Sequence, residues 1–267
     1  MQFQIDNAIA WAYTGGKPFD SSLPTLVFIH GAQNDHSVWA LQSRYFAHHG
    51  YGVLAIDLPG HGRSNGPALT SIEALAAWII KVLDAAGVAK ASLIGHSMGS
   101  LITLEAASQF PDRLHKIALL GSAFPMKVSD SFLDAAKNDV QRAIEMGTSW
   151  SHSSIAQKPS CPGPGFYVPT GHLRLAQRIA SINPDHGYFT DLSACNQYAN
   201  GLQAAANVSC PALFLCAERD VMTPAKAAQG LIKAVNGAQV VKIAACGHAM
   251  MAEQPDQVLR ALRAFLA

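Results

Sequence analysis

The sequence predicts an α/β protein in which helices cover both faces of a mostly parallel, eight-stranded sheet. Short apolar runs of strand length, flanked by glycine and proline, are typical of parallel strands that are buried on both faces. Amphipathic stretches with helical spacing separate these runs, so strands and helices alternate along the chain. The 267 residues are 49% hydrophobic and 14% charged, which is enough apolar material for one sizeable core.

An antiparallel hairpin is expected to open the sheet, because apolar residues alternate on both sides of Asp6-Asn7. Its two strands are predicted at residues 3–5 and 9–13. Six further strands are predicted from apolar runs at residues 26–29, 53–56, 91–94, 114–120, 212–215 and 239–243. Together these segments make up the eight strands of the predicted sheet.

Three of the intervening helices are indicated by a start signal or an apolar face. Thr70 and Glu73 form a capping box, which predicts that a helix starts there. Thr223 followed by Pro224 predicts a second helix start, because a cap residue precedes a proline at the first turn. The last helix is predicted from an apolar face made of Val258, Leu259, Leu262, Phe265 and Leu266.

Residues 124–208 interrupt the alternation of strands and helices and are too long for a plain loop. Helices are predicted at residues 130–146 and 172–182, separated by a proline- and glycine-rich stretch at residues 159–165. We therefore expect a helical cap at residues 124–208, inserted after the sixth strand. Residues 1–123 and 209–267 would then form the core domain.

Charge and cysteine content restrict the expected partners and cofactors. The formal net charge of +1 gives no electrostatic reason to expect nucleic acid or an anionic membrane as a partner. No signal peptide is visible, and the apolar runs are too short to span a bilayer. The five cysteines form no C-x-x-C pair, so free thiols in the cytoplasm are expected. No metal-ligand spacing or nucleotide-binding motif occurs, so no metal or cofactor is expected.

The pentapeptide Gly95-His96-Ser97-Met98-Gly99 follows a predicted buried strand and precedes a predicted helix. A G-x-S-x-G sequence in this context is a nucleophile elbow. The glycines are required because any Cβ would collide with the neighbouring strand or helix. Ser97 is therefore the candidate nucleophile.

A serine hydroxyl is a weak nucleophile at neutral pH and needs a nearby base. His248 is the candidate, because it lies in a loop between the last strand and the last helix, at the sheet edge where α/β ligand sites form. The base needs an acid that fixes its tautomer and stabilises the imidazolium. Asp220 is the preferred acid, because it directly precedes a helix start, and Glu218 is the alternative.

Attack on a carbonyl also needs donors aimed at the developing oxyanion, and backbone amides provide them. One is expected from Met98, the residue after the nucleophile. The other is expected from Ala32, in the loop that follows the strand at residues 26–29. His30, at the base of that loop, is interpreted as a structural hydrogen-bonding residue.

Together with Asp57-Leu-Pro-Gly-His-Gly-Arg-Ser64, these stretches resemble the cap-bearing serine hydrolases of the α/β-hydrolase fold superfamily. That group includes carboxylesterases, C–C bond hydrolases and enol-lactonases. The resemblance covers nearly the whole chain except the cap, and the order Ser97, Asp220, His248 is that of the family's triad. It implies the α/β-hydrolase fold, with the stretch from Asp57 to Ser64 as a turn that supports the site.

We expect a serine hydrolase, most simply a carboxylesterase, that cleaves a small, fairly apolar ester through an acyl-enzyme. Lactonase, C–C hydrolase, thioesterase and perhydrolase activities are alternatives on the same site. A non-catalytic ligand-binding member of the fold is a more remote alternative. Substrates with carboxylates would need a cation in the pocket, for which the candidates in the cap are Arg142, Lys158, Arg174 and Arg178.

Overall fold

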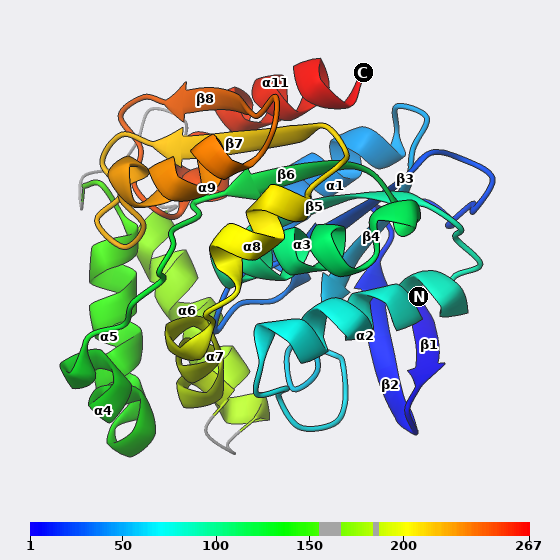
Figure 1. Ribbon diagram of the computed structural model, residues 1–267. Helices are drawn as coiled ribbons and strands as arrows, with labels where there is room; N and C mark the ends of the chain where they lie inside the picture. Colours follow the sequence, from blue (N-terminus) through cyan, green and yellow to red (C-terminus); the bar gives the residue numbers. More distant parts are fainter. Residues whose placement is uncertain (155–166, 184–186) are drawn as a thin grey trace.

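The computed structural model describes residues 1–154, 167–183 and 187–267, and it confirms the α/β fold (Figure 1). One eight-stranded sheet runs in the order β1-β2-β4-β3-β5-β6-β7-β8. The pairs β1–β2 and β2–β4 are antiparallel, and the other five neighbouring pairs are parallel. The strands are β1 (Gln2–Ile5), β2 (Ala8–Tyr13), β3 (Thr25–Ile29), β4 (Gly52–Asp57), β5 (Ala91–His96), β6 (Leu114–Leu120), β7 (Ala212–Ala217) and β8 (Gln239–Ile243).

Helices cover both faces of this sheet (Figure 1). On one face lie α1 (Ala40–Ala47) and α11 (Pro255–Leu266). On the other lie α2 (Ile72–Ala85), α3 (Met98–Gln109) and α9 (Gln229–Ala234). Short elements complete the core: the 3₁₀ turns η1 (His36–Trp39), η2 (Pro111–Arg113) and η3 (Ala225–Ala228), and α10 (Met250–Glu253).

Strand β3 shows why the central strands are continuous apolar runs. Val27 and Ile29 belong to the cluster under α2 and α3, whereas Leu26 and Phe28 belong to the cluster under α1 and α11. Successive side chains of a strand point to opposite faces, and both faces are covered here. Each face therefore needs apolar residues, and the alternation seen in a half-exposed strand is absent from β3.

Two helix starts differ from the sequence prediction. The cap of α2 is Ser71, whose Oγ accepts from Ala74 N at 3.1 Å, so this helix starts one residue later than a cap at Thr70 requires. Near Thr223, the 3₁₀ turn begins only at Ala225, with Pro224 in the cap position. No side chain caps this turn, and the Thr223 hydroxyl instead donates to Asp220.

The chain between β6 and β7 contains α4 (Asp130–Asn138), α5 (Val140–Ser151), α6 (Val168–Ile182), α7 (Gly187–Gln197) and α8 (Gly201–Asn207). The single helix predicted at residues 130–146 is divided in two, because Asp139 leaves the helical conformation and accepts from Arg142 N to cap α5. The breaker-rich stretch at residues 159–165 lies outside the described residues.

Helices α4, α5, α6 and α7 gather beyond the carboxyl ends of the central strands (Figure 1). Residues of all four contribute to a hydrophobic cluster of their own, which includes Phe132, Ile144, Ala176 and Leu192. Helix α8, by contrast, packs against α3 and α9 of the core. We propose that α4–α7 form the cap and that α8 belongs with the core. No helix in the described ranges is long and apolar enough to cross a membrane.

Candidate active site

Ser97 occupies a tight turn between β5 and α3. Its backbone has φ 55° and ψ −119°, a conformation that residues with a side chain rarely adopt. A Cβ on Gly95 would lie 2.0 Å from Gly99 O, and a Cβ on Gly99 would lie 2.4 Å from Ile29 O. Both glycines are therefore required by close backbone approach. The turn presents Ser97 to a cavity at the start of α3.

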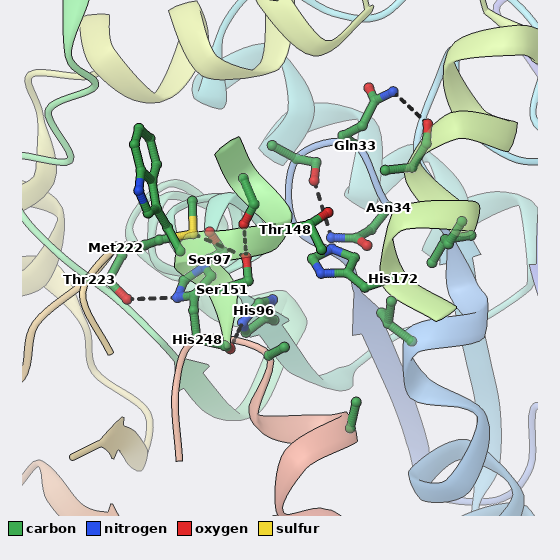
Figure 2. Close-up of a pocket in the computed structure, with 18 of the residues that line it drawn as sticks. Gln33, Asn34, His96, Ser97, Thr148, Ser151, His172, Met222, Thr223 and His248 are labelled. Carbon is green, nitrogen blue, oxygen red and sulfur yellow. Dashed lines mark hydrogen bonds between the residues drawn. The ribbon is translucent and has the colours of Figure 1, made fainter. Parts of the chain in front are cut away.

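His248 and Asp220 meet beside this turn. Nδ1 of His248 lies 2.8 Å from Oδ2 of Asp220, and both residues are buried. Because a carboxylate only accepts hydrogen bonds, this contact places the ring proton on Nδ1 and leaves Nε2 as the basic nitrogen. Ser97 and His248 line the same cavity (Figure 2). Glu218, the alternative acid, is exposed.

Asp220 is held as a carboxylate by its surroundings. Burial alone would raise the pKa of Asp220, but the charge and hydrogen bond of His248, with the hydrogen bonds from Thr223, hold that pKa well below its usual range. Its Oδ1 accepts from Met222 N at 2.9 Å and from Thr223 N at 2.8 Å. The acid is therefore both charged and fixed in orientation.

Thr223 makes a third contact within this pair. Its Oγ1 donates to Oδ2 of Asp220 at 2.7 Å and lies 3.0 Å from Nδ1 of His248 (Figure 2). Because the hydroxyl proton is directed to Asp220, the oxygen can share the Nδ1 proton of His248 with the carboxylate. The sequence predicts Thr223 only as a helix cap. Its contact with His248 arises because the fold brings the two loops together.

The loop that carries His248 is fixed from two sides. His96 Nε2 lies 2.9 Å from the carbonyl oxygen of His248, which makes Nε2 the donor nitrogen of that ring. Burial, followed by the charge of His248, lowers the pKa of His96 to about 3, so the ring is neutral. On the other side, Glu253 Oε1 accepts from Gly247 N at 3.0 Å, and the same carboxylate accepts from Ser153, which follows α5.

Two backbone amides beside Ser97 have no acceptor among the hydrogen bonds of the described chain. They belong to Met98, the first residue of α3, and to Ala32, which lines the cavity. Next to Ala32, Gln33 adopts a positive φ of 56°. The N-terminal position of Met98 adds the favourable end of the helix dipole for a negative charge. Both amides are therefore available to an oxyanion.

Hydrogen bonds to His30 and Asp57 hold the base of the loop that carries Ala32. His30 Nε2 accepts from Leu58 N at 3.0 Å, and its Nδ1 lies 2.8 Å from Gly31 O. Burial, followed by the nearby His61, lowers the pKa of His30 to about 4, so this histidine is neutral. Asp57 accepts from the backbone amides of His36 and Arg63, both at 2.8 Å. These contacts fit the structural roles expected for His30 and Asp57.

The cavity has a volume of about 790 Å³ and lies between the core and the helices α5, α6 and α7. Most of its lining is apolar. Aromatic and methionine residues from the chain between β6 and β7 contribute to it, namely Met126, Phe132, Trp150 and Tyr188. Such a lining suits an apolar organic molecule with a few polar groups.

Comparison with known proteins gives the family. A profile of the alpha/beta hydrolase fold matches residues 24–255. The chain belongs to the alpha/beta hydrolase fold family.

Relatives of this α/β-hydrolase carry several hydrolytic activities. The (E)-2-((N-methylformamido)methylene)succinate hydrolase of Acinetobacter baylyi is 26% identical over 251 residues, which is 90% of this chain and 89% of that protein. The crystal structure of the enol-lactonase from Burkholderia xenovorans superimposes with a TM-score of 0.83 at 20% identity, covering 100% and 99% of the two chains. An esterase from Exiguobacterium antarcticum gives a TM-score of 0.82 at 17% identity, covering 99% and 98%. These structural likenesses show the fold.

Three of the four candidate cations of this α/β-hydrolase lie in described residues, and none of these three contributes to the cavity lining. Arg178 pairs with Asp35, and Arg174 donates to Gln177 at 3.0 Å. Arg142 is exposed on α5 and does not contribute to the cavity lining. Lys158 lies outside the described residues. Within the described lining the one formally charged side chain is Lys127, which is exposed and donates to Asn196 O at 3.2 Å.

Asp35, His36 and Asp57 bring three potential metal-ligand atoms within 4.8 Å of one another in the described part of the chain. Each acid is already engaged in holding the loop. Asp57 Oδ1 lies 2.8 Å from His36 Nδ1, and Asp35 Oδ1 accepts from Ser37 N at 2.9 Å. The cluster is accounted for by these structural contacts.

Proposed function

We propose that this α/β-hydrolase is a serine hydrolase that cleaves a small, fairly apolar carboxylic ester through an acyl-enzyme intermediate. The proposal is carried by one arrangement: Ser97, at the nucleophile elbow, shares a cavity with His248, whose Nδ1 is bound to the buried Asp220. This is the nucleophile, base and acid of an acyl-transfer enzyme in the chain order of the family.

In the proposed reaction, Nε2 of His248 takes the hydroxyl proton of Ser97 as Oγ attacks the ester carbonyl. The amides of Ala32 and Met98 bind the oxyanion of the tetrahedral intermediate. The C–O bond to the alcohol then breaks, and His248 gives its proton to the departing oxygen. Water, deprotonated by the same nitrogen, then attacks the acyl carbonyl. The bond from the acyl carbon to Ser97 Oγ breaks, His248 returns the proton to Oγ, and the carboxylic acid leaves. Asp220 stabilises the imidazolium during both acylation and deacylation.

The apolar cavity supports an ester with little charge. Because a lactone is a cyclic ester, the same residues would also open a lactone ring, and an enol-lactonase is among the structural neighbours. C–C hydrolase, thioesterase and perhydrolase activities would use the same nucleophile. A ligand-binding protein without catalysis is disfavoured because acid, base, serine and amides are all present.

The test is the change of Ser97→Ala, assayed on a short p-nitrophenyl ester. Removal of the nucleophile should reduce kcat by at least ~10³-fold. A fluorophosphonate probe should label the native protein at Ser97 and leave the variant unlabelled. Ser22→Ala, an exposed serine before β3, is the matched control and should keep both activity and labelling. Retained turnover in the Ser97 variant would overturn the proposal, and a native protein that does not react would favour the non-catalytic alternative.

A further inference from the structure

Three buried polar atoms of residues that line the cavity have no hydrogen-bond partner in the described part of the chain, namely Asn34 Oδ1, His96 Nδ1 and His172 Nδ1. Neighbouring polar groups of the lining are engaged. Gln33 Nε2 donates to Ala176 O at 3.0 Å, and Ser151 Oγ donates to Gly147 O at 2.7 Å. Buried polar atoms are rarely left unpaired, because each one loses its hydration without compensation. His96 Nδ1 lies against the backbone of Gly31, where an added Cβ would be 3.3 Å from it. Asn34 Oδ1 and His172 Nδ1 are therefore the two atoms positioned to meet a ligand.

Asn34 offers an acceptor with a fixed direction. The residue is only 7% exposed, and its Nδ2 donates to Ala32 O at 3.1 Å. This bond fixes the amide, because the reversed orientation would place two oxygens against each other. Oδ1 is consequently the atom that faces the cavity without a partner, and it can only accept.

His172 offers a neutral and adaptable nitrogen on the cap side. Burial, followed by the nearby His152 and His248, lowers the pKa of His172 to about 3. The ring is therefore uncharged at neutral pH, and its buried Nδ1 either donates or accepts according to the tautomer. His152 packs edge-on against this ring with centroids 5.3 Å apart, which holds the ring in place.

The two groups come from opposite walls. Asn34 follows β3 in the core, whereas His172 belongs to α6 of the proposed cap. Figure 2 shows both at one end of the cavity, with Thr223 and His248 at the other. A substrate that reaches Ser97 and extends along the cavity would therefore pass between a fixed acceptor and a neutral imidazole.

We propose that Asn34 and His172 form a subsite for a neutral hydrogen-bond donor of the substrate, a hydroxyl or an amide N–H, in the cavity that Ser97 lines. This inference rests on the proposed hydrolase function. It names the substrate class as esters that carry a neutral hydrogen-bond donor. A donor group satisfies Oδ1 of Asn34, and its own oxygen or carbonyl can be bound by a protonated Nδ1 of His172.

A carboxylate at this position is excluded by the same chemistry. It carries only acceptors at neutral pH, so it would oppose the lone pairs of Asn34 Oδ1. His172 is neutral and supplies no compensating charge, and Lys127 is exposed with its ammonium bound to Asn196 O. The subsite thus separates hydroxylated or amide-bearing esters from esters of dicarboxylic acids.

The experiment compares matched esters on the native protein. Ethyl 3-hydroxybutanoate against ethyl butanoate places the donor on the acyl part, and 2-hydroxyethyl butanoate against propyl butanoate places it on the alcohol part. We expect the hydroxylated member of at least one pair to have a kcat/KM about 3- to 10-fold higher, the value of one buried hydrogen bond. Monoethyl succinate should be poorer than ethyl butanoate. Equal values within both pairs, or a preference for monoethyl succinate, would overturn the subsite.

The assignment to these two residues is tested by one ratio, the kcat/KM of the hydroxylated ester divided by that of its partner in the preferred pair. Asn34→Ala and His172→Leu should each bring that ratio towards one, whatever happens to the overall rate. Asn138→Ala on α4 and His115→Gln on β6 remove the same kinds of side chain from exposed positions and should keep the native ratio. An unchanged ratio in both cavity variants contradicts the assignment.

A binding measurement separates this inference from the hydrolase proposal. Calorimetric titration of the Ser97→Ala protein with the same esters reports recognition without turnover. We expect the hydroxylated ester of the preferred pair to bind about 3- to 10-fold more tightly. If Ser97→Ala retains hydrolysis, the proposed mechanism fails while the subsite stands on this affinity difference. If no ester pair shows a difference in affinity, the subsite fails while the mechanism stands.

Discussion

His61 Nε2 lies 2.8 Å from Oδ2 of Asp191, and both side chains are almost completely buried. His61 belongs to the loop after β4, and Asp191 belongs to α7. The Nδ1 of His61 lies 3.0 Å from Pro59 O, so both ring nitrogens face acceptors and the ring is an imidazolium. The same Asp191 oxygen accepts from Gln33 N at 2.9 Å. A buried ion pair therefore joins the proposed cap to the loop after β4, and a hydrogen bond to the same carboxylate joins the cap to the loop that carries Ala32.

The first prediction concerns stability against pH. Burial alone would lower the pKa of His61, but the Asp191 charge and the hydrogen bonds to Asp191 and Pro59 raise it. A raised pKa means that the pair contributes fully below the unfolded value of about 6.5, and that its contribution is lost as pH rises through the folded pKa. Asp191→Asn should lower the free energy of unfolding by up to about 3 kcal/mol at pH 6 and by much less at pH 9.

Urea unfolding at the two pH values measures this difference. Asn keeps an oxygen that can accept from Gln33 N, so the variant removes mainly the charge. The exposed Asp112→Asn on η2 is the control, and it should show the native stability at both pH values. A loss of equal size at pH 6 and pH 9 would show that the His61 charge contributes nothing.

The second prediction distinguishes Asp220 from Glu218 as the acid. Asp220→Asn should reduce kcat by roughly 10³–10⁴-fold, because an amide cannot hold the required tautomer or stabilise the imidazolium. Glu218→Gln should leave kcat unchanged, since Glu218 is exposed and does not contact His248. Steady-state kinetics of the two variants on one ester gives the comparison. A greater loss in the Glu218 variant would reverse the assignment.

The third prediction assigns Thr223 a positioning role. Thr223→Val keeps the shape but removes the hydroxyl that bridges Asp220 and His248. We expect kcat to fall about 3- to 10-fold with little change in KM, because the lost hydrogen bond orients the base and does not bind substrate. Thr223→Ser restores the hydroxyl and should restore kcat. A rise in KM with unchanged kcat would instead place Thr223 in substrate binding.

What could be predicted from the sequence depended on local constraints. Gly95 and Gly99 flank Ser97 at fixed spacing because the backbone approaches too closely for any Cβ, so the elbow is visible in five residues. The strands are visible because both faces of the sheet are covered.

Contacts that depend on tertiary structure were not visible. His61 and Asp191 are 130 positions apart and pair only because α7 folds over the β4 loop. The contact of Thr223 with His248 likewise spans 25 positions. The unpartnered atoms of Asn34 and His172 could not be foreseen, because pairing is decided by neighbours that sequence spacing does not specify.

The last prediction tests the steric argument for the elbow. Gly95→Ala introduces a Cβ that would lie 2.0 Å from Gly99 O and 2.4 Å from Thr103 Oγ1, so β5 and α3 must separate. We expect a loss of at least about 3 kcal/mol in the free energy of unfolding, together with loss of fluorophosphonate labelling. Gly230→Ala in α9 is the control, because its Cβ would meet only the flexible end of Leu202, at 3.3 Å, and alanine favours a helix by about 1 kcal/mol over glycine. Urea unfolding of both variants decides the matter: native stability and labelling in Gly95→Ala would mean that the close approach of β5 to α3 does not require glycine.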